Sequence, residues 1–425
     1  MLLTLLAFVI VLGVLIFVHE LGHFVAAKRS KVRVEVFSMG FGPRLLTVTR
    51  GETDYVLSAI PFGGFIKMAG ENPEQEPEGH PWEFLAKTKK TRALIVVAGP
   101  AMNFVLAIVI FTFLIYTIGV GVTNTRVIGA VEANSAASAA GLREGDTVLS
   151  VGGIEVKTWD EMLEIIAGNL GKRVVIVVER GGSPVNAELD LSQVKDYSGL
   201  GMSPFDQAIL DFAKIGGPAH RAGLRGGDKI IAINGVPITN WRDIRAVVEP
   251  SADKPLRIAW ERNGARDSAT VTPRKETGVG RIDVSYRFDK RRIGLLESLV
   301  MGSRQTMLVS REIFNFFPKL LSGRVSSDEV GGPVRIGQIA GETFRWGWSV
   351  FLSFIAVMSA QLGLINLLPI PILDGGHILI LGVETAIRKP INVRQRIVAQ
   401  QIGFALLVAV MVGLTFKDIV RVLVK

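Results

Sequence analysis

Four long apolar runs constrain this chain more than any other feature of its sequence. A helix needs roughly 20 apolar residues to cross the hydrocarbon core of a bilayer. Each run is long enough and carries little charge, and the four lie at 1–18, within 93–125, within 346–373 and within 397–416. Hydrophobic residues make up 48% of the 425 residues. We therefore expect a polytopic α-helical membrane protein with about four transmembrane helices.

The first run differs from a secretory signal peptide, which has a basic region before its apolar core and a small-residue cleavage site after it. No basic residue precedes this run, and it leads into His19-Glu20-Leu21-Gly22-His23 and then Lys28 and Arg29. The sequence therefore predicts a membrane helix that is retained.

Basic residues next to the apolar runs predict the orientation of the helices. They gather after the first run, before the second, and between the third and fourth: Lys28, Arg29, Lys31, Arg33, Lys87, Lys89, Lys90, Arg92, Arg388, Lys389, Arg394 and Arg396. The positive-inside rule places these connections in the cytoplasm, so that both termini and the long region between runs two and three lie outside. Because this pattern accounts for most of the net charge of +9, we predict no nucleic-acid partner.

A His-Glu-x-x-His motif closes the first apolar run. His19 and His23 share one helix face, so both imidazoles can bind one metal ion, and Glu20 is placed to take a proton from the attacking water. Ionisable groups inside a membrane helix cost about 2.5–3.5 kcal/mol each on insertion scales and are usually functional. The alternative is a helix that ends at Val18, with the motif at the membrane surface; the apolar residues at 24–27 favour a continuing helix.

A hydrolytic zinc site needs a third protein ligand and one open position. Asp374 is the best candidate, because an aspartate that closes an apolar segment is costly without a partner. Pro369 and Pro371 are expected to break the helix before it, and non-helical backbone at membrane depth occurs where it is buried in protein or lines a wet cavity. The remaining histidines are less suitable ligands: His80, His220 and His377.

The region from about 126 to 289 contains a duplication. Gly141-Leu-Arg-Glu-Gly-Asp146 recurs as Gly223-Leu-Arg-Gly-Gly-Asp228, and Trp159 recurs as Trp241, always at the same offset along the chain. Two modules of equal length therefore lie in tandem. Each module ends in a Gly-x-Gly stretch, at 198–202 and at 277–281.

Other segments give weaker indications. Residues 32–68 are rich in β-branched residues with glycine-containing turns, which predicts strands in either a membrane-associated hairpin or a small cytoplasmic sheet. Residues 71–83 predict an acidic surface loop, and 295–320 predict an amphipathic helix that lies in the membrane interface. Asn103, within the second apolar run, is expected to make an interhelical hydrogen bond, with an active-site role as the alternative.

Taken together, these motifs resemble the bacterial site-2 protease family of the RseP type, the regulator-of-sigma-E intramembrane zinc metalloproteases. The resemblance rests on His-Glu-Leu-Gly-His, on Asn-x-x-Pro-x-Pro-x-Leu-Asp-Gly at 366–375, and on the modules between them, whose repeated pattern resembles PDZ domains. It covers nearly the whole chain. It implies that His19, His23 and Asp374 bind Zn²⁺ and that Glu20 is the general base.

The resemblance also implies how a substrate is held. Asn366 would hold the substrate backbone or the oxyanion, and Pro369 and Pro371 would shape the loop that clamps the substrate. Residues 32–68 would form a membrane re-entrant β-hairpin whose edge pairs with an unwound substrate strand, where Gly40 and Gly42 allow close approach of the two backbones.

We expect two tandem, circularly permuted PDZ-like α+β domains between two membrane halves. The expected parts are a first membrane half (1–125), the two PDZ-like domains (126–206 and 207–290), an amphipathic interfacial linker (291–345) and a second membrane half (346–425). The PDZ-like domains would act as a size filter or as a peptide-binding gate.

The resemblance implies a bacterial inner-membrane enzyme, embedded in the lipid bilayer, with its active site towards the cytoplasmic side. Its partners would be single-pass membrane proteins cut within the bilayer, such as an anti-sigma factor after a first cut or signal-peptide remnants. The residues alone also allow a non-catalytic membrane scaffold or a metal transporter. The complete set of ligands and base argues against a scaffold, and the absence of a repeat between the membrane halves argues against a transporter.

Overall fold

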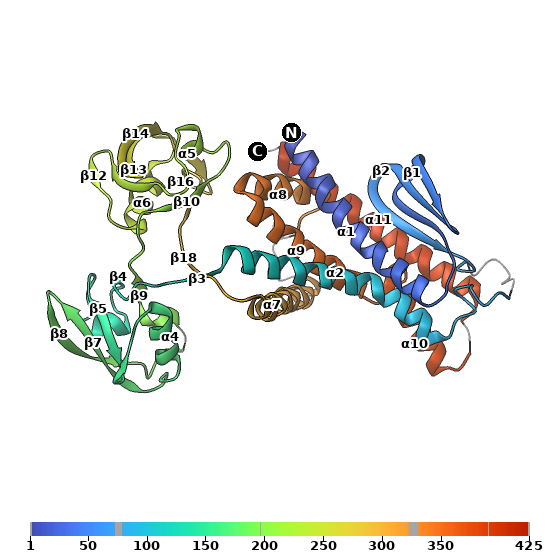
Figure 1. The fold of residues 1–425 in the computed structure, drawn as a ribbon, viewed down its shortest axis with the longest axis horizontal. Coiled ribbons are helices and arrows are strands. Elements are labelled where there is room, and N and C mark those ends of the chain that lie inside the picture. The colour runs from blue at the N-terminus through green and yellow to red at the C-terminus, as the bar shows by residue number, and fades with distance from the viewer. Residues whose placement is uncertain (1, 73–78, 196, 323–329, 390, 424–425) are drawn as a thin grey trace. The chain divides into compact units, whose positions relative to one another are not determined.

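The computed structural model describes residues 2–72, 79–195, 197–322, 330–389 and 391–423. The chain divides into two compact units (Figure 1). We call residues 1–117 with 293–425 the membrane unit, and residues 118–292 the module unit. Part of the acidic loop predicted at 71–83 lies outside the described residues.

Four helices among the described residues are long and apolar enough to cross a membrane, and they match the four predicted spans. They are α1 (Leu2–Arg29), α2 (Lys89–Ile118), α9 (Trp348–Asn366) and α11 (Val393–Leu423). Since α1 continues without a break to Arg29, the helix does not end at Val18, and the His-Glu-x-x-His motif lies within it.

In the described part of the membrane unit there are three further helices: α7 (Leu295–Leu321), α8 (Pro333–Trp346) and α10 (Asp374–Ala386). The amphipathic helix predicted at 295–320 corresponds to α7. The sequence reasoning missed α8 and α10 because both are short and lie beside longer apolar runs. Asp418 of α11 accepts a hydrogen bond from the backbone nitrogen of Arg335 at 2.8 Å, which satisfies one of the unpaired amides at the start of α8.

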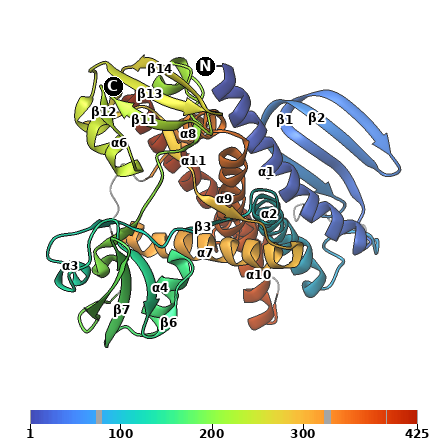
Figure 2. The same cartoon turned by 60° about the vertical axis from the view of Figure 1, so that its left-hand side comes forward.

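Residues 34–68 form a bent antiparallel pair of strands, β1 (Val34–Arg50) and β2 (Thr53–Met68). Both strands fold back on themselves, so that Phe37 pairs with Tyr55 on one side and with Ile66 on the other. Gly40 and Gly42 lie at the bend of β1 with φ of +89° and +85°, a conformation that favours glycine. The pair packs along α1 (Figure 2).

The two modules of the module unit have the same topology. Each has a four-stranded antiparallel sheet, ordered β6-β5-β7-β8 in the first and β12-β11-β13-β14 in the second. The strands of the first sheet are β5 (Thr147–Val151), β6 (Ile154–Glu155), β7 (Arg173–Arg180) and β8 (Ser183–Asp190). Those of the second are β11 (Lys229–Ile233), β12 (Val236–Pro237), β13 (Leu256–Arg262) and β14 (Ala265–Val271).

A pair of short strands and two α-helices accompany the sheet of each module. In the first they are β4 (Ile128–Val131), α3 (Ala136–Ala139), α4 (Trp159–Ala167) and β9 (Met202–Pro204). In the second they are β10 (Leu210–Ala213), α5 (Pro218–Arg221), α6 (Trp241–Val248) and β17 (Val284–Tyr286). Strand β3 (Val120–Val122) pairs with β18 (Asp289–Arg291), so the two ends of the module unit meet.

The duplication extends to one buried ion pair per module. Asp146, 1% exposed, accepts hydrogen bonds from Arg180 at 2.7 Å, and Asp228, fully buried, accepts them from Arg262 at 2.6 and 2.8 Å. In both modules the same guanidinium also donates to the backbone oxygen of the glycine that opens the repeated motif, at 2.8 Å. The sequence repeat is therefore preserved in the contacts that fix each sheet to its loop.

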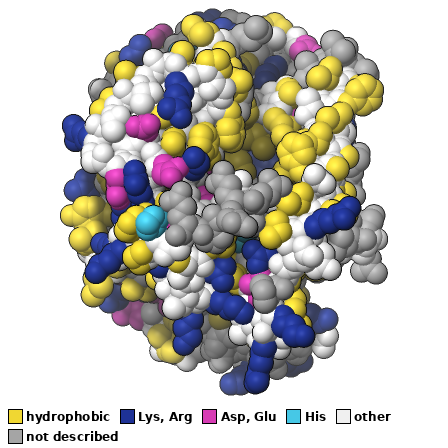
Figure 3. All heavy atoms as spheres, turned by 90° about the vertical axis from the view of Figure 1, so that its right-hand side faces the viewer, with side chains coloured by type: hydrophobic (Ala, Val, Ile, Leu, Met, Phe, Trp, Pro, Cys, Tyr) yellow, Lys and Arg dark blue, Asp and Glu magenta, His cyan; other side chains and the backbone are white. Residues whose placement is uncertain are grey.

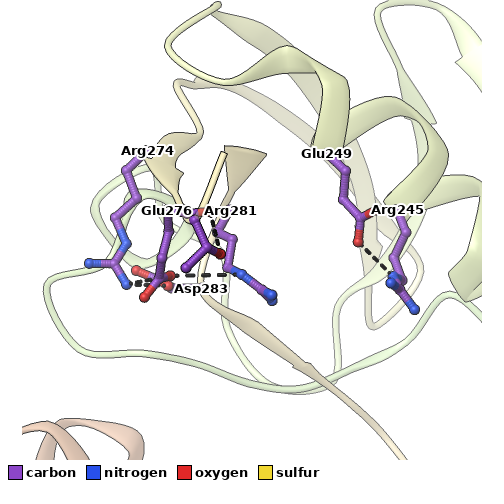
Figure 4. A network of polar contacts seen from close by, with 7 residues as sticks. Arg245, Glu249, Arg274, Glu276, Arg281 and Asp283 are labelled. Atoms are coloured by element: carbon purple, nitrogen blue, oxygen red, sulfur yellow. Dashed lines mark hydrogen bonds and ion pairs between the residues drawn. The ribbon is translucent and has the colours of Figure 1, made fainter. Parts of the chain in front are cut away.

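The second Gly-x-Gly stretch forms a tight hairpin. Strands β15 (Arg274–Glu276) and β16 (Val279–Arg281) pair across Thr277 and Gly278, which both have positive φ. Figure 4 shows the guanidinium of Arg274 facing the carboxylates of Glu276 and Asp283, which lie 3.1 and 3.2 Å from it.

Candidate metal centre and catalytic cavity

Three side chains from two distant helices meet at one point of the membrane unit. His19 Nε2 and His23 Nε2 of α1 lie 3.2 Å apart. Asp374 Oδ2, at the start of α10, lies 3.2 Å from the first and 3.5 Å from the second. His19 and His23 are buried, and Asp374 is half-buried. The candidates proposed from the sequence as metal ligands are thus brought together by the fold.

This donor set fits zinc. Tetrahedral zinc with bonds of about 2.0–2.1 Å separates its ligand atoms by about 3.3–3.4 Å. The three measured separations lie within about 0.2 Å of that spacing. Two imidazoles and one carboxylate leave a fourth position open, which is typical of hydrolytic sites.

Residues of α2 fix the ring of His23. Its Nδ1–H donates to the backbone oxygen of Ile95 at 2.9 Å, which leaves the Nε2 lone pair directed towards His19 and Asp374. Gly99 lies against the same ring, and a Cβ at this position would overlap the ring atoms. The second helix therefore sets both the tautomer and the position of this imidazole.

Asn103 of α2 holds His19 in the same way. It is fully buried, and its side-chain nitrogen lies 3.1 Å from His19 Nδ1, which confirms the predicted interhelical hydrogen bond. Within the described part of the chain, its Oδ1 has no partner. Exchanging the positions of the amide oxygen and nitrogen places Oδ1 against Nδ1, so that the ring donates Nδ1–H and keeps its Nε2 lone pair for a metal. Sequence reasoning placed Asn103 in an interhelical bond without identifying His19 as its partner.

The loop between α9 and α10 places Asp374. As predicted at Pro369 and Pro371, the helix is interrupted there: α9 ends at Asn366 and α10 begins at Asp374. The two glycines that follow Asp374 allow this loop to pack directly on α10, because a Cβ on either one would overlap loop backbone. The amide nitrogen of Asn366 lies 3.4 Å from His19 Nε2, beside the candidate metal centre.

A cavity of about 540 Å³ opens next to the three candidate ligands. Glu20 lines it, one residue after His19, and strand residues 64–68 of β2 form another part of its wall. A Cβ on Gly64 would lie 3.2 Å from Glu20 Cγ, so glycine here leaves room beside the carboxylate. Gly40 and Gly42 lie at the bend of β1 and are not among the described residues that line the cavity.

Comparison with known proteins identifies the family. The model of peptidase family M50 matches residues 7–410 of the chain. The chain belongs to this family. As an M50 peptidase it is a membrane zinc metalloprotease, and the predicted resemblance to the site-2 proteases is confirmed. With its four apolar helices it is an inner-membrane protein.

Relatives of this M50 peptidase align over nearly its whole length. The regulator of sigma E protease of Salmonella typhi is 35% identical, and the regulator of sigma-E protease RseP of Escherichia coli K12 is 33% identical, each over 98% of both chains. A predicted zinc metalloprotease of Neisseria meningitidis is 31% identical over 99% of both chains.

One solved structure similar to part of the M50 peptidase is the PDZ domain of an SdrC-like protein from Listeria monocytogenes. It is 16% identical, and the match covers 20% of this chain and 90% of that domain. The TM-score is 0.18, too low to assign a fold.

Proposed function

We propose that the chain is an intramembrane endopeptidase in which His19, His23 and Asp374 bind zinc and Glu20 is the general base. The observation that carries this proposal is the convergence of the three ligand atoms beside Glu20 in a single cavity. The ligands come from opposite ends of the sequence, so their meeting is a property of the fold.

Zinc in this position supplies Lewis acidity to a peptide carbonyl. Glu20 accepts a proton from the attacking water and then donates it to the leaving amine. Asn366, whose amide reaches the candidate metal centre, donates a hydrogen bond to the substrate backbone or to the developing oxyanion. Pro369 and Pro371 keep the α9–α10 loop non-helical and shape the clamp on the peptide.

The substrate has to unwind locally, because the carbonyl groups of a helix are hydrogen-bonded within it. Residues 64–68 of β2 line the cavity and pair with β1 on one side. On the other edge the backbone nitrogen of Met68 donates to Glu71, so a substrate strand would add along the part of this edge before Met68. Gly40 and Gly42 permit the bend of β1 and a close approach of a second backbone there. Large apolar side chains remain exposed on this pair of strands, which suits a hairpin inserted in the membrane: Phe41, Leu45, Leu46, Leu57, Ile60 and Phe65.

The substrates we propose are single-pass membrane proteins, cut within their transmembrane segment. Two of the reported relatives are named for regulation of sigma E, and they align over 98% of the chain. We therefore place an anti-sigma factor, shortened by a first cut, ahead of signal-peptide remnants as the physiological substrate.

We propose that the two modules are circularly permuted PDZ-like domains that work mainly as a size filter. The tight hairpin of the second Gly-x-Gly stretch supports this role. A Cβ on Gly280 would overlap the backbone oxygen of Val248, so the hairpin packs directly on the end of α6. A carboxylate-binding loop would instead leave backbone amides free for a peptide end.

The proposed topology places the termini and the modules outside the cytoplasm of a bacterial cell, with the active site towards the cytoplasmic side. Basic residues flank the ends of α1, α2 and α11 on that side. Figure 3 shows one face of the molecule, on which Lys and Arg side chains gather in the lower part.

A cleavage assay tests the catalytic proposal. Purified protein is incubated with a detergent-solubilised single-pass substrate, and zinc content is measured in parallel. We expect Glu20→Gln to keep its zinc and to cut about 10²–10⁴-fold more slowly. Glu35→Gln is the matched control, because Glu35 lines the same cavity but pairs with Lys67 at 2.8 Å. Equal cleavage by Glu20→Gln, or zinc-free active protein, would contradict the proposal.

A further inference from the structure

The catalytic cavity has a second polar region, away from the candidate metal centre. Its wall there includes Arg92 from the first turn of α2 and Arg396 from the first turn of α11, together with Gln400. The lining also includes apolar side chains, among them Ile95 and Leu381, and the imidazole of His377. The two arginines are additional polar groups in the same cavity.

One carboxylate already belongs to this region. Glu384 of α10 is 1% exposed and forms an ion pair with Arg396. The same carboxylate accepts a hydrogen bond from the backbone nitrogen of Ile391 at 3.0 Å. Lys89 donates to the backbone oxygen of Glu384 at 2.8 Å, which ties the start of α2 to α10. Glu384 is thus a structural partner of Arg396.

Arg92 has no such partner. Among the residues that the structure describes, none forms an ion pair with its guanidinium, and its buried Nε has no acceptor. The buried Nε of Arg396 also has no acceptor within the described residues. Two guanidinium groups therefore share the charge of one carboxylate, and among the described residues Arg92 has no ion pair of its own. A partly buried cation without a partner is costly, and a bound anion would offset that cost.

The other acidic residues of the cavity wall do not fill this role. Glu35 pairs with Lys67, and Glu71 accepts a hydrogen bond from the backbone nitrogen of Met68 at 3.1 Å. Glu20 and Asp374 lie at the end with the histidines.

We propose that Arg92 and Arg396 form a subsite that binds an acidic side chain of the peptide substrate. This inference rests on the proposed protease function. The occupant is a peptide carboxylate, because the cavity is continuous with the candidate catalytic residues and is bordered by strand residues 64–68 of β2. A guanidinium matches a carboxylate with two parallel hydrogen bonds, which gives position as well as charge.

The structure also predicts how far this side chain lies from the scissile bond. Arg92 precedes Ile95, whose backbone oxygen holds His23, by three residues, a rise of about 4.5 Å along the helix. The distance from the candidate metal centre to the Arg92 guanidinium is this rise plus the reach of an arginine side chain. An extended peptide covers that distance with about two to four residues. We therefore expect the acidic residue about two to four positions from the scissile bond, on the side that faces the start of α2.

The test uses the full-length protein with single-pass substrates that differ at one position in that window, carrying Asp, Asn or Lys. We expect the Asp substrate to have a KM about 10-fold lower than the Asn substrate in the wild type. Arg92→Gln should abolish this preference, Arg92→Lys should keep part of it, and Arg92→Glu should favour the Lys substrate. Lys90→Gln is the matched control, because Lys90 lies on the same turn of α2, is exposed and is absent from the described cavity wall.

The outcomes separate this inference from the proposed function. Cleavage of the Asn substrate without any preference for Asp would overturn the subsite and leave the protease intact, whereas no cleavage of any substrate would count against the protease itself. An equal loss of kcat on all substrates in Arg92→Gln, with no change in preference, would show a purely structural role and overturn the subsite. A KM that follows the anionic phospholipid content of the micelles, and not the substrate charge, would assign the arginines to a lipid phosphate and overturn the peptide assignment.

Discussion

Asn103 and His19 meet across the packed surfaces of α2 and α1, next to Asp374. A buried amide beside an imidazole fixes which ring nitrogen carries the proton, and such partners of metal ligands influence metal affinity strongly. At this site the amide lies 3.1 Å from the ring, and Ser359 donates to the backbone oxygen of Asn103 at 2.8 Å. The side chain of Asn103 is therefore held by His19, and its backbone is held by Ser359 of α9.

We expect Asn103→Leu, which keeps the volume and removes the hydrogen bond, to lower zinc affinity by about 10–100-fold. Competition with a chelator while zinc is measured gives this affinity directly. Thr112→Val is the control, because Thr112 is also buried on α2 and its hydroxyl has no partner among the described residues. Unchanged zinc affinity in Asn103→Leu would show that the amide only fills space.

At the scale of the elements, the junction of α9 and α10 decides whether Asp374 reaches the histidines. The loop folds back so closely that the backbone of Ile370 lies against Gly376. The hydrogen bond from the nitrogen of Gly376 to the oxygen of Leu373, at 2.9 Å, ties the first turn of α10 to this loop. The loop is therefore packed tightly against the first turn of α10.

We expect Gly376→Ala to displace the loop, because the added Cβ would overlap the oxygen of Ile370. Cleavage should fall by at least about 100-fold, since small misplacements of catalytic groups are costly. Gly382→Ala provides the control on the same helix, where a Cβ meets nothing within 4 Å. Initial cleavage rates and zinc content of both variants are compared with the wild type, and full activity in Gly376→Ala would contradict the expected displacement.

At the scale of the whole molecule, the buried ion pair of Asp146 and Arg180 makes the stability of the first module depend on pH. Burial favours the neutral form of Asp146, but the hydrogen bonds and charge of Arg180 outweigh it and hold the pKa of this carboxyl below its ordinary value. A carboxyl with a lowered pKa stabilises the fold above its unfolded-state pKa, and this stabilisation is lost as pH falls through the folded-state pKa. The first module should therefore lose stability below about pH 4.

Asp146→Asn should remove this part of the pH dependence and lower the unfolding temperature of the first module by at least about 5 °C at neutral pH. Proteolysis of the full-length protein at a series of temperatures, with fragments identified by mass spectrometry, distinguishes the modules. Asp228→Asn is the matched control, because it removes the corresponding pair of the second module. Equal sensitivity of both modules to Asp146→Asn would contradict the assignment.

The proposed topology has a direct test, because the chain contains no cysteine. We introduce single cysteines at two exposed positions, Ser183 in the first module and Arg388 between α10 and α11. A membrane-impermeant maleimide should label Ser183→Cys in intact spheroplasts, and Arg388→Cys only after permeabilisation. The unmodified chain measures background labelling, and the reverse pattern would invert the topology.

The sequence alone determined the elements whose signals are local. Apolar runs of membrane length predicted α1, α2, α9 and α11, and the spacing of His19 and His23 placed both rings on one face of α1. The constant offset between the repeated motifs predicted two modules, and these have the same strand order. Each of these signals depends only on residues close in the chain or on a simple repeat, so no knowledge of packing was needed.

Only the tertiary structure decided which side chains meet. Such meetings depend on the rotation and depth of each helix against its neighbours, and close contacts set both: a Cβ on Gly22 of α1 would overlap the backbone of Ala98 of α2. This packing gives His19 its contact with Asn103 and places Arg92 in the wall of the catalytic cavity. No local pattern encodes these distances, because they are sums of contacts between segments far apart in the chain.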